Sequence, residues 1–306
     1  MPSLDDTNAV TLAAGNLTAV FLPSHGMLGA SLRYRDMEIL RRIDDLETAA
    51  EHGSTAGIPF LYPWANRLSQ LHYKKAGPEV TLDRKSPLLH FDGNGLPIHG
   101  IPWSRLAWTV ADRTDHSVTA TLDWSRPDLL AIFPYAHHLS MTAFLRTDGL
   151  LIGTTIVAEE AGAVPLSFGF HPYIGLPNIP RAQWRLLLPS MRKLGLDAKG
   201  IPTGKETQFE GYDELLGQQA FDDGFVLHKE EPQAMFTLSG GDLAVTLALL
   251  EGYTHAQIYS PEGADFIALE PMTAATNALV SGNGLRLLVP GGAFNAAFGI
   301  GISPTA

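Results

Sequence analysis

Alternation of apolar and polar residues with a period of two dominates this chain. The segments that follow it are Asn16–Leu22, Ala107–Asp112, Ser117–Trp124, His138–Arg146, Leu151–Ala158, Leu243–Leu249 and Phe294–Ile302. Each is short, rich in β-branched or aromatic residues and bounded by Gly, Pro, Asn or Asp, which is typical of β-strands with one buried face. Asp148-Gly149 between two of these segments predicts a hairpin turn.

Helical periodicity is confined to three short stretches, Asp44–His52, Arg126–Ile132 and Met272–Val280. The stretch Gly195–Gly224 is richer in Gly and polar residues, and we interpret it as an excursion over the surface. No fixed-period repeat occurs and nothing marks a domain boundary. We therefore expect an all-β fold, a large antiparallel β-sandwich with a few short helices, formed as a single domain by residues 1–306.

Composition and charge exclude several classes of function. The chain has 306 residues and no Cys, which excludes a disulfide framework, a thiol nucleophile and a thiolate metal site. A net charge of −11 argues against nucleic acid or an anionic membrane as a partner. The acidic start lacks the pattern of a signal peptide, and the richest apolar run, Leu285–Ile302, is cut by Pro290 and two glycines. We expect a soluble, cytoplasmic protein.

Four segments place single polar residues in apolar or small-residue surroundings. They are Gly57–Arg67, Pro97–Gly100, Gly169–Tyr173 and Ala268–Thr273, and they supply Arg67, His99, His171 and Glu270. A buried polar group needs a partner or a function, because leaving it unpaired is costly. If the segments converge, they form a site with a base, an acid and fixed donors, suited to handling hydroxyl groups.

His171 and Glu270 each end an apolar strand pattern and precede a proline. In the segment before His171, Phe168 and Phe170 share one face, and Gly169 and His171 share the other. The following proline keeps each of the two residues extended. A glutamate that ends an apolar strand is expected to be desolvated, which raises its pKa toward the range of a useful base.

Each of these residues also has a structural interpretation. A His-Pro pair in an apolar strand is often only a hydrogen-bonded core histidine, Glu270 can instead cap a helix at Met272–Val280, and Arg67 can pin a loop through backbone carbonyls. A metal triad of His99, His171 and Glu270 lacks any supporting local spacing. A glycosidase pair of Glu270 and Asp222 fits less well than an imidazole opposite one carboxylate. No nucleotide-binding glycine motif, P-loop or serine elbow is present.

In their order and spacing, these motifs resemble the aldose 1-epimerase (galactose mutarotase) family over nearly the whole chain. The segments that carry the resemblance are Ala19–Pro23, Gly26–Leu32, Pro63–Arg67, Ile98–Gly100, Phe170–Tyr173, Phe221–Phe225, Leu269–Pro271 and Pro290–Phe294. One departure is Pro172-Tyr173-Ile174-Gly175-Leu176, where many members have a small polar residue and then Tyr-Phe-Asn-Leu; this bears on the substrate rather than the chemistry.

The resemblance implies a sugar held in a groove on one sheet, with no metal and no cofactor. It implies that Glu270 is the general base toward the anomeric hydroxyl and that His171 is the general acid toward the ring oxygen. The remaining residues would bind substrate: Arg67, His99, Asn66, Tyr173 and Asp222, with Asp223 in place of Asp222 if the register is off by one.

The expected function is therefore interconversion of the α and β anomers of a free hexose such as glucose or galactose. The alternatives are a hexose-6-phosphate 1-epimerase, for which Arg105 is a possible contact, and a non-catalytic sugar-binding protein of the same fold. The preferred aldose and the oligomeric state are left open.

Overall fold

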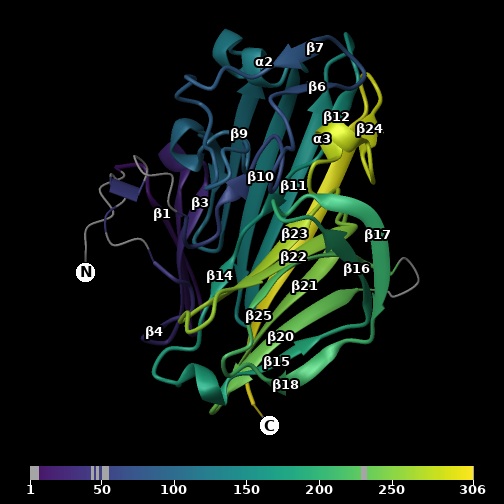
Figure 1. The fold of residues 1–306 in the computed structure, drawn as a ribbon. Helices are drawn as coiled ribbons and strands as arrows, with labels where there is room; N and C mark the ends of the chain where they lie inside the picture. Colours follow the sequence, from purple (N-terminus) through teal and green to yellow (C-terminus); the bar gives the residue numbers. More distant parts are fainter. Residues whose placement is uncertain (1–6, 43–44, 46–47, 50–54, 229–232, 306) are drawn as a thin grey trace.

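The computed structural model describes residues 7–42, 45, 48–49, 55–228 and 233–305 (Figure 1). Two large sheets and three smaller ones make up these residues. Every pairing between named strands in this part of the chain is antiparallel. The predicted antiparallel all-β architecture is confirmed.

The first large sheet has nine strands in the order β18-β15-β20-β21-β25-β11-β10-β9-β8. The predicted strands from Ala107 onward all lie in it, and the predicted hairpin joins β10 to β11 with Arg146 opposite Gly149. The strands are β8 (Thr109–Arg113), β9 (Ser117–Trp124), β10 (His137–Arg146), β11 (Gly149–Ala158), β15 (Arg185–Leu188), β18 (Tyr212–Leu215), β20 (Ala234–Gly240), β21 (Leu243–Glu251) and β25 (Ala293–Pro304).

The second large sheet has the order β17-β16-β19-β22-β23-β13-β5, with β14 also paired to β23. It lies in front of the first sheet in Figure 1. Its strands are β5 (Phe60–Leu61), β13 (Gly169–Phe170), β14 (Tyr173–Ile174), β16 (Met191–Leu196), β17 (Pro202–Phe209), β19 (Phe221–Val226), β22 (His255–Ser260) and β23 (Ile267–Met272).

Smaller elements complete the described chain. The strands are β1 (Val10–Ala14), β2 (Leu17–Leu22), β3 (Leu28–Tyr34) and β4 (Met37–Glu38) in one sheet, β6 (His72–Lys74) with β7 (Glu79–Thr81), and β12 (Val164–Leu166) with β24 (Arg286–Leu288). The short helices are α2 (Pro127–Ile132) and α3 (Ala278–Ser281), with 3₁₀ turns η1 (Pro23–His25), η2 (Trp103–Arg105) and η3 (Arg181–Gln183). Helix α2 matches its prediction, since Pro127 suits the first turn and Leu129 and Ile132 are buried.

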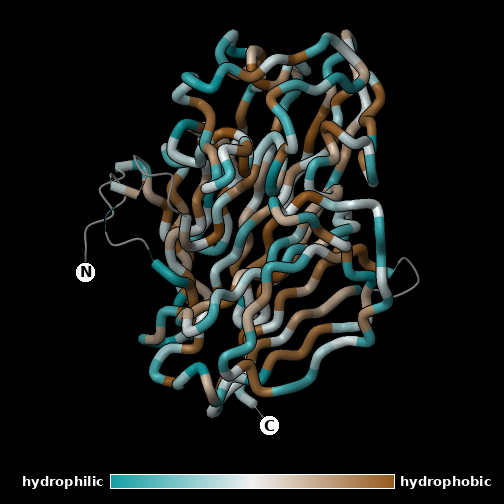
Figure 2. The backbone as a smooth tube through the Cα atoms, in the orientation of Figure 1, coloured by the Kyte–Doolittle hydropathy of each residue, from teal (hydrophilic) through white to brown (hydrophobic). Residues whose placement is uncertain are grey.

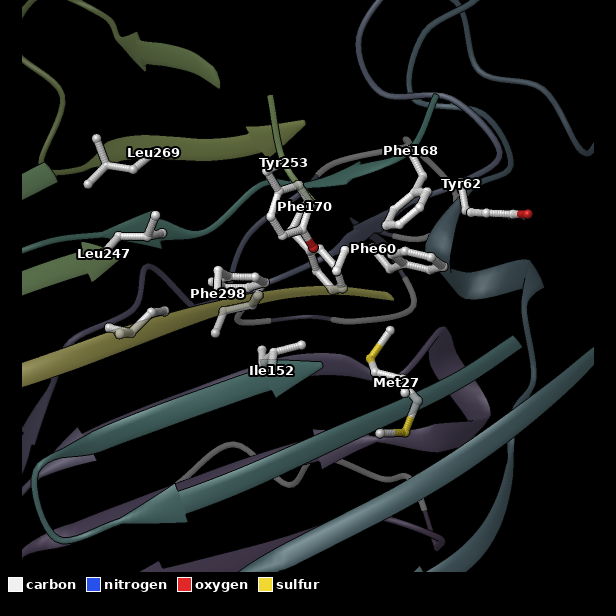
Figure 3. Packing of buried hydrophobic residues seen from close by; sticks show 14 of the residues in the cluster. Met27, Phe60, Tyr62, Ile152, Phe168, Phe170, Leu247, Tyr253, Leu269 and Phe298 are labelled. Carbon is white, nitrogen blue, oxygen red and sulfur yellow. The ribbon is translucent and has the colours of Figure 1, made fainter. Parts of the chain in front are cut away.

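The hydrophobic core lies between the two large sheets. Phe170 of β13 packs on Phe298 of β25 with ring centroids 5.0 Å apart, and Leu269 of β23 and Ile152 of β11 are likewise buried (Figure 3). Burying one such side chain contributes roughly 1.5–3 kcal/mol to stability. Hydrophobic residues follow the strands, and hydrophilic residues are common in the peripheral loops (Figure 2).

Strand β23 divides its residues between the core and the opposite face of the sheet. Ile267 and Leu269 belong to the main core cluster. Ala268 packs instead with Tyr173, and Met272 packs with Leu61, in small clusters outside that core. Because side chains alternate along a strand, Glu270 lies on the same side as Ala268 and Met272. The face of the sheet turned away from the core therefore carries the carboxylate.

One prediction about local structure is wrong, one is correct in part, and one falls largely outside the described residues. The predicted helix Met272–Val280 is shortened to Ala278–Ser281, because Met272 pairs with Gly169 and His255 as the last residue of β23. The stretch Gly195–Gly224 does lie mostly at the surface, but it is regular, since it contains β17, β18 and most of β19. The predicted helix 44–52 lies largely outside the described residues.

Among the described residues, no helix has both the length and the apolar character needed to cross a membrane.

Candidate active site

A cavity of about 250 Å³ opens on the face of the second sheet that is turned away from the core. Every site residue predicted from the sequence lines it. The complete lining is Thr55, Asn66, Arg67, His90, Asp92, Ile98, His99, His171, Tyr173, Asp222, Gln257, Tyr259 and Glu270. Asp223 is not part of this set and instead pairs with Lys193 Nζ at 2.8 Å. The structure therefore places Asp222, rather than Asp223, at the cavity.

The floor of the cavity is a ladder of residues across three neighbouring strands. Glu270 of β23 lies opposite Gln257 of β22, which lies opposite Gly224 of β19. Asp222 is two residues from Gly224 and therefore on the same face. The Gln257 Nε2 group donates a hydrogen bond to Asp222 Oδ1 at 2.7 Å. This bond fixes the predicted hydroxyl-binding aspartate to the glutamine that lies opposite the predicted base.

His171 is held directly beside Glu270. Its amide donates to the Pro59 carbonyl at 3.1 Å, which fixes the backbone where β13 ends. Its ring stacks on Tyr173 with centroids 4.2 Å apart, and its Nε2 lies 3.1 Å from Glu270 Oε1. The His171 and Glu270 side chains are only 6% and 2% exposed, so the contact is shielded from water. The sequence prediction that these two residues meet in space agrees with this geometry.

Burial opposes the charged form of both members of this pair. It lowers the pKa of His171 to about 3. It also raises the pKa of Glu270 well above its usual value, with Asp222 adding to the rise and Arg67 partly offsetting it. Burial therefore favours the form of the pair with a neutral carboxylic acid beside a neutral imidazole. Glu270 Oε2 and His171 Nδ1 have no hydrogen-bond partner among the described residues, so both atoms have unused capacity.

His99 is positioned by a tight reciprocal contact with Asn66. The Asn66 amide donates to His99 Nδ1 at 3.1 Å, and the His99 amide donates to the Asn66 carbonyl at 2.9 Å. Both residues have positive φ, 59° and 61°, as has Gly100 at 67°. A Cβ on Gly100 would lie 2.2 Å from the Tyr62 carbonyl oxygen, so only glycine fits there. Because Nδ1 accepts, Nε2 is the donor of the neutral His99 ring.

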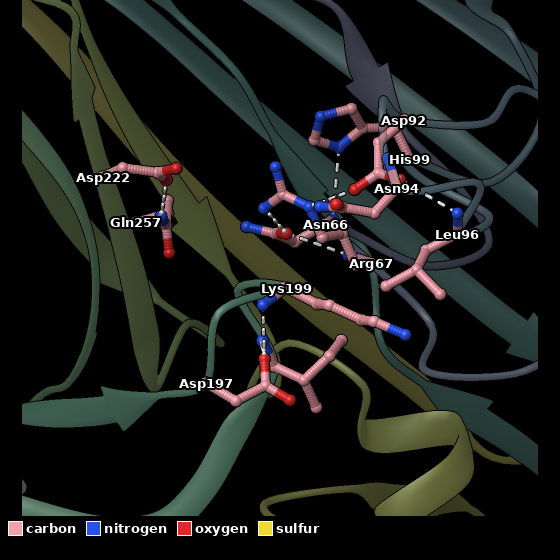
Figure 4. A network of polar contacts seen from close by, with 11 residues as sticks. Asn66, Arg67, Asp92, Asn94, Leu96, His99, Asp197, Lys199, Asp222 and Gln257 are labelled. Carbon is pink, nitrogen blue, oxygen red and sulfur yellow. Dashed lines mark hydrogen bonds and ion pairs between the residues drawn. The ribbon is translucent and has the colours of Figure 1, made fainter.

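The Arg67 side chain is held by two other side chains (Figure 4). The alternative prediction, that Arg67 pins a loop through backbone carbonyls, does not match these contacts. Its Nε donates to Asp92 Oδ2 at 2.8 Å and its Nη1 to Asn66 Oδ1 at 3.1 Å. The other Asp92 oxygen accepts from the Asn94 and Leu96 amides, both at 2.9 Å. Burial alone raises the pKa of Asp92, but the hydrogen bonds from Leu96 and Arg67 outweigh it and keep that pKa below its usual value.

Two polar residues that organise the cavity, Asp92 and Gln257, were not predicted from the sequence. Asp92 stands in a turn, Asp92-Gly93-Asn94-Gly95, and its only local signal is that of a turn former. Gln257 is 3% exposed in β22, and a buried glutamine in a strand was a usable signal for a partner. The position of Tyr259 depends on the strand register, and Thr55 lies in a loop before β5, so neither could be read locally.

Two of the alternatives lose support. Glu270 is paired within β23 and does not cap a helix, since α3 begins only after Asn277. In the described part of the chain, no group of three His, Cys, Asp or Glu side chains has an arrangement that could hold a metal ion. The triad of His99, His171 and Glu270 is thus not supported as a metal site.

We expect Glu270→Gln to become more stable than the wild type as pH rises from 5 to 8. The raised pKa of Glu270 means that wild-type stability is greatest below its unfolded-state value and falls as pH rises toward the folded-state value. In that window the free energy of unfolding of the variant, relative to that of the wild type, grows by up to about 1.4 kcal/mol per pH unit, which corresponds to a few °C in Tm.

Thermal unfolding of both proteins across this pH range measures the effect. The lowered pKa of His171 acts with the opposite sign, since its contribution is present above pH 6.5 and is lost as pH falls. Both proteins retain this histidine, so the difference between them isolates Glu270. A difference that does not change with pH would contradict the assigned burial of the carboxyl.

Comparison with known proteins gives a consistent result. The sequence profile described as aldose 1-epimerase matches residues 8–298. The uncharacterized protein YihR of Escherichia coli K12 is 24% identical over 250 residues, covering 76% of this chain and 74% of that protein. A galactose mutarotase-like protein from Clostridium acetobutylicum has a similar fold, with a TM-score of 0.84, 18% identity, and coverage of 97% and 95% of the two chains. Galactose 1-epimerase from Lactobacillus acidophilus also has a similar fold, with a TM-score of 0.77 and 14% identity, and the match covers 97% of this chain and 95% of that one.

Proposed function

Since the chain belongs to the aldose 1-epimerase family, we propose that it interconverts the α and β anomers of a free aldohexose such as glucose or galactose. The observation that carries this proposal is the contact of 3.1 Å between His171 Nε2 and Glu270 Oε1 inside a cavity lined by hydrogen-bonding groups. An imidazole and a carboxyl in one shielded site can pass protons in both directions, as a reversible reaction requires.

Ring opening uses the pair as carboxylate and imidazolium. Glu270 takes the proton from the C1 hydroxyl, the C1–O1 bond becomes a carbonyl, and the C1–O5 bond breaks. The released electron pair goes to the ring oxygen, which takes the proton from His171. The open aldehyde turns about its C1–C2 bond, and the reverse steps close the ring as the other anomer. These two proton transfers need neither a metal nor a cofactor.

After ring opening the enzyme is left with a protonated Glu270 and a neutral His171. This is the protonation state that burial favours. It is also the state that closes the ring, since Glu270 can return its proton to O1 while His171 accepts one from the C5 hydroxyl. A proton moved across the 3.1 Å contact converts one working state into the other.

The remaining cavity residues would hold the sugar. Arg67 and His99 present donors to sugar oxygens and to charge that develops in the transition state. Asp222 accepts from sugar hydroxyls beside Gln257, and Tyr173 and Asn66 complete the wall. Tyr173 also receives support from Thr55 through a short contact between their hydroxyl groups.

A hexose 6-phosphate is a poorer fit to this cavity. Arg67 is the only Lys or Arg among its lining residues, and it is already paired with Asp92. Asp222 and Glu270 add further carboxylates, and a dianionic phosphate needs uncompensated donors. Arg105 is exposed on η2 and does not line the cavity.

NMR of freshly dissolved α-glucose and α-galactose, with catalytic amounts of protein, tests the proposal. Faster appearance of the β anomer than in buffer alone is the expected result. Acceleration of glucose 6-phosphate only would favour the phosphate alternative. Binding of a hexose without any acceleration would identify a sugar-binding protein instead.

We expect Asp92→Asn to raise KM about tenfold and to change kcat much less. The substitution removes a charge-assisted hydrogen bond that holds Arg67, and part of its roughly 1.5–3 kcal/mol is lost to substrate binding. Polarimetric rates at several hexose concentrations give KM and kcat separately. Asp213→Asn is the control. It breaks an exposed ion pair, with 2.7 Å between Arg185 Nε and Asp213 Oδ1, that does not line the cavity. An unchanged KM in Asp92→Asn would show that Arg67 keeps its position without Asp92.

A further inference from the structure

The outer side of the nine-stranded sheet, turned away from the second large sheet in Figure 1, carries a face without charged side chains. Ile152 and Phe298 of this sheet belong to the core, so the residues next to them in sequence point away from it. We define the neutral face as every second residue, beginning with the first, of the ranges 117–121, 140–144, 151–157, 235–239, 244–250 and 295–303. None of these residues is Asp, Glu, Lys, Arg or His, although charged residues make up 17% of the chain. A soluble surface usually carries charges at roughly a quarter to a third of its positions.

No other part of the described chain covers the neutral face. Each of its residues is exposed or partly exposed, and the Phe144 and Met235 side chains are 41% and 54% exposed. The middle of the face is flat because Gly153, Gly299 and Gly301 have no side chains. A Cβ on Gly153 would meet no atom within 4 Å. A second flat surface can therefore approach closely between the projecting apolar side chains.

Several polar groups of the neutral face are already paired with one another. Three side-chain hydrogen bonds cross between neighbouring strands: Thr119 with Thr142 at 2.9 Å, Thr237 with Thr246 at 2.9 Å, and Thr155 with Asn295 Oδ1 at 2.8 Å. Burial of a polar group is costly mainly when it is left without a partner. These side chains keep their partners when water is removed, so covering the face costs little.

Charged residues surround the neutral face and are largely paired there. The ion pairs at its margin are Arg146 with Asp148, Arg185 with Asp213, and His138 with Asp123. Glu251 lies at the end of β21, also at the margin. A centre without charges inside a charged, solvent-accessible rim is the usual composition of a protein–protein interface.

The size of the neutral face matches that of a stable dimer interface. It spans six strands, which at about 4.8 Å between strands gives a width of roughly 25 Å, and its length along the strands is similar. The projected area is on the order of 600 Å² before the relief of the side chains is counted. A standard interface buries about 800 Å² on each partner. The face and its rim together provide this area.

The composition of the neutral face identifies a second copy of the chain as its partner. The net charge of −11 makes two copies repel each other wherever charged surfaces meet, and only an uncharged face avoids this repulsion. The face lacks the carboxylates that would attract a basic protein and the basic side chains that nucleic acid or an anionic membrane requires. Its hydroxyl groups outnumber its large apolar side chains, which disfavours insertion into lipid.

We infer that two copies of this chain associate through their neutral faces, related by a twofold axis. Each copy then contributes the same residues, and two sheets pack face to face about 10 Å apart. The cavity with Glu270 lies on the outer face of the other large sheet, so both cavities remain open in the dimer.

Sedimentation velocity of the full chain at micromolar concentration tests the inference without any sugar, so its outcome is independent of the proposed function. The expected mass is twice the 33.0 kDa of one chain. Gly153→Glu and Ala248→Glu each place a carboxylate on the neutral face, and each is expected to weaken association at least about 100-fold, because two like charges are then buried together. Ala131→Glu on the exposed surface of α2 is the matched control and should remain a dimer.

A spin-label distance identifies the interface without relying on variants that weaken it. The chain has no Cys, so Ala297→Cys introduces a single labelling position on β25, opposite Gly153 in the middle of the face. The expected distance between the two labels is below roughly 30 Å, since the facing sheets are about 10 Å apart.

The two measurements support or overturn the inference together. A wild-type mass of one chain overturns it, as does a dimer that persists unchanged in both glutamate variants. A label distance well above 30 Å in a dimer would place the contact on another surface and overturn it too. Loss of the dimer in the two glutamate variants, with the control intact, supports it.

Discussion

Replacement of Glu270 by glutamine is expected to slow anomer exchange by roughly 10²–10⁴-fold, the usual contribution of a positioned general base. This loss corresponds to about 2.7–5.4 kcal/mol of transition-state stabilisation. Glutamine keeps the shape of the side chain on β23 and can still hydrogen-bond, but it cannot take the proton from the C1 hydroxyl. We therefore expect kcat to fall, while the affinity for the sugar stays within about threefold.

Polarimetry gives the rate, and a ligand-detected NMR titration gives the affinity. Glu214→Gln is the control, because Glu214 is exposed on β18 and far from the cavity in sequence and sheet order. Thermal unfolding confirms that the variant folds, and it should be at least as stable as the wild type at neutral pH. Exchange at the wild-type rate in Glu270→Gln would remove the carboxylate from the mechanism.

Loss of the His171 ring is expected to have an effect of the same size, roughly 10²–10⁴-fold on kcat. His171→Ala deletes the proton donor to the ring oxygen and leaves a space next to Glu270 and Tyr173. Imidazole added to the solution can enter this space and should restore part of the activity. Such rescue is specific to a proton-transfer role, because free imidazole could not replace a purely structural histidine.

The matched control is His138→Ala, which removes an exposed histidine paired with Asp123 and Glu159 on the nine-stranded sheet. It should leave exchange unchanged with and without imidazole. Full activity of His171→Ala without imidazole would assign the acid role to another group, with His99 the nearest imidazole at 5.5 Å between ring centroids.

Strand predictions succeeded where one face of a strand is buried. Ser117–Trp124 alternates along its length because Val118, Ala120, Leu122 and Trp124 all face the core. The same logic failed in β17, whose residues are exposed or only partly buried. A strand at the edge of a sheet with no buried face carries no apolar alternation, and its sequence resembles a loop.

Predictions about the candidate site depended on how each residue is held. His171 and Glu270 could be placed at strand ends from the prolines that follow them. The partnership of Arg67 with Asp92 spans 25 positions and depends on the turn at Asn94 and Leu96, so no local pattern contains it. The predicted helix starts late because Met272 stays in β23 through its pairing with Gly169 and His255, and Asn277 has a positive φ of 69° just before α3.

The division of β23 between two faces has an evolutionary consequence. Deletion of one residue within Ile267–Met272 would shift the alternation and turn Glu270 toward the position of Leu269 in the core. Such a mutation would remove the carboxylate from the cavity and bury it among hydrocarbon side chains in a single step. Substitutions along the cavity wall can therefore alter what descendants of this protein bind, whereas a one-residue change in the length of β23 would abolish the site.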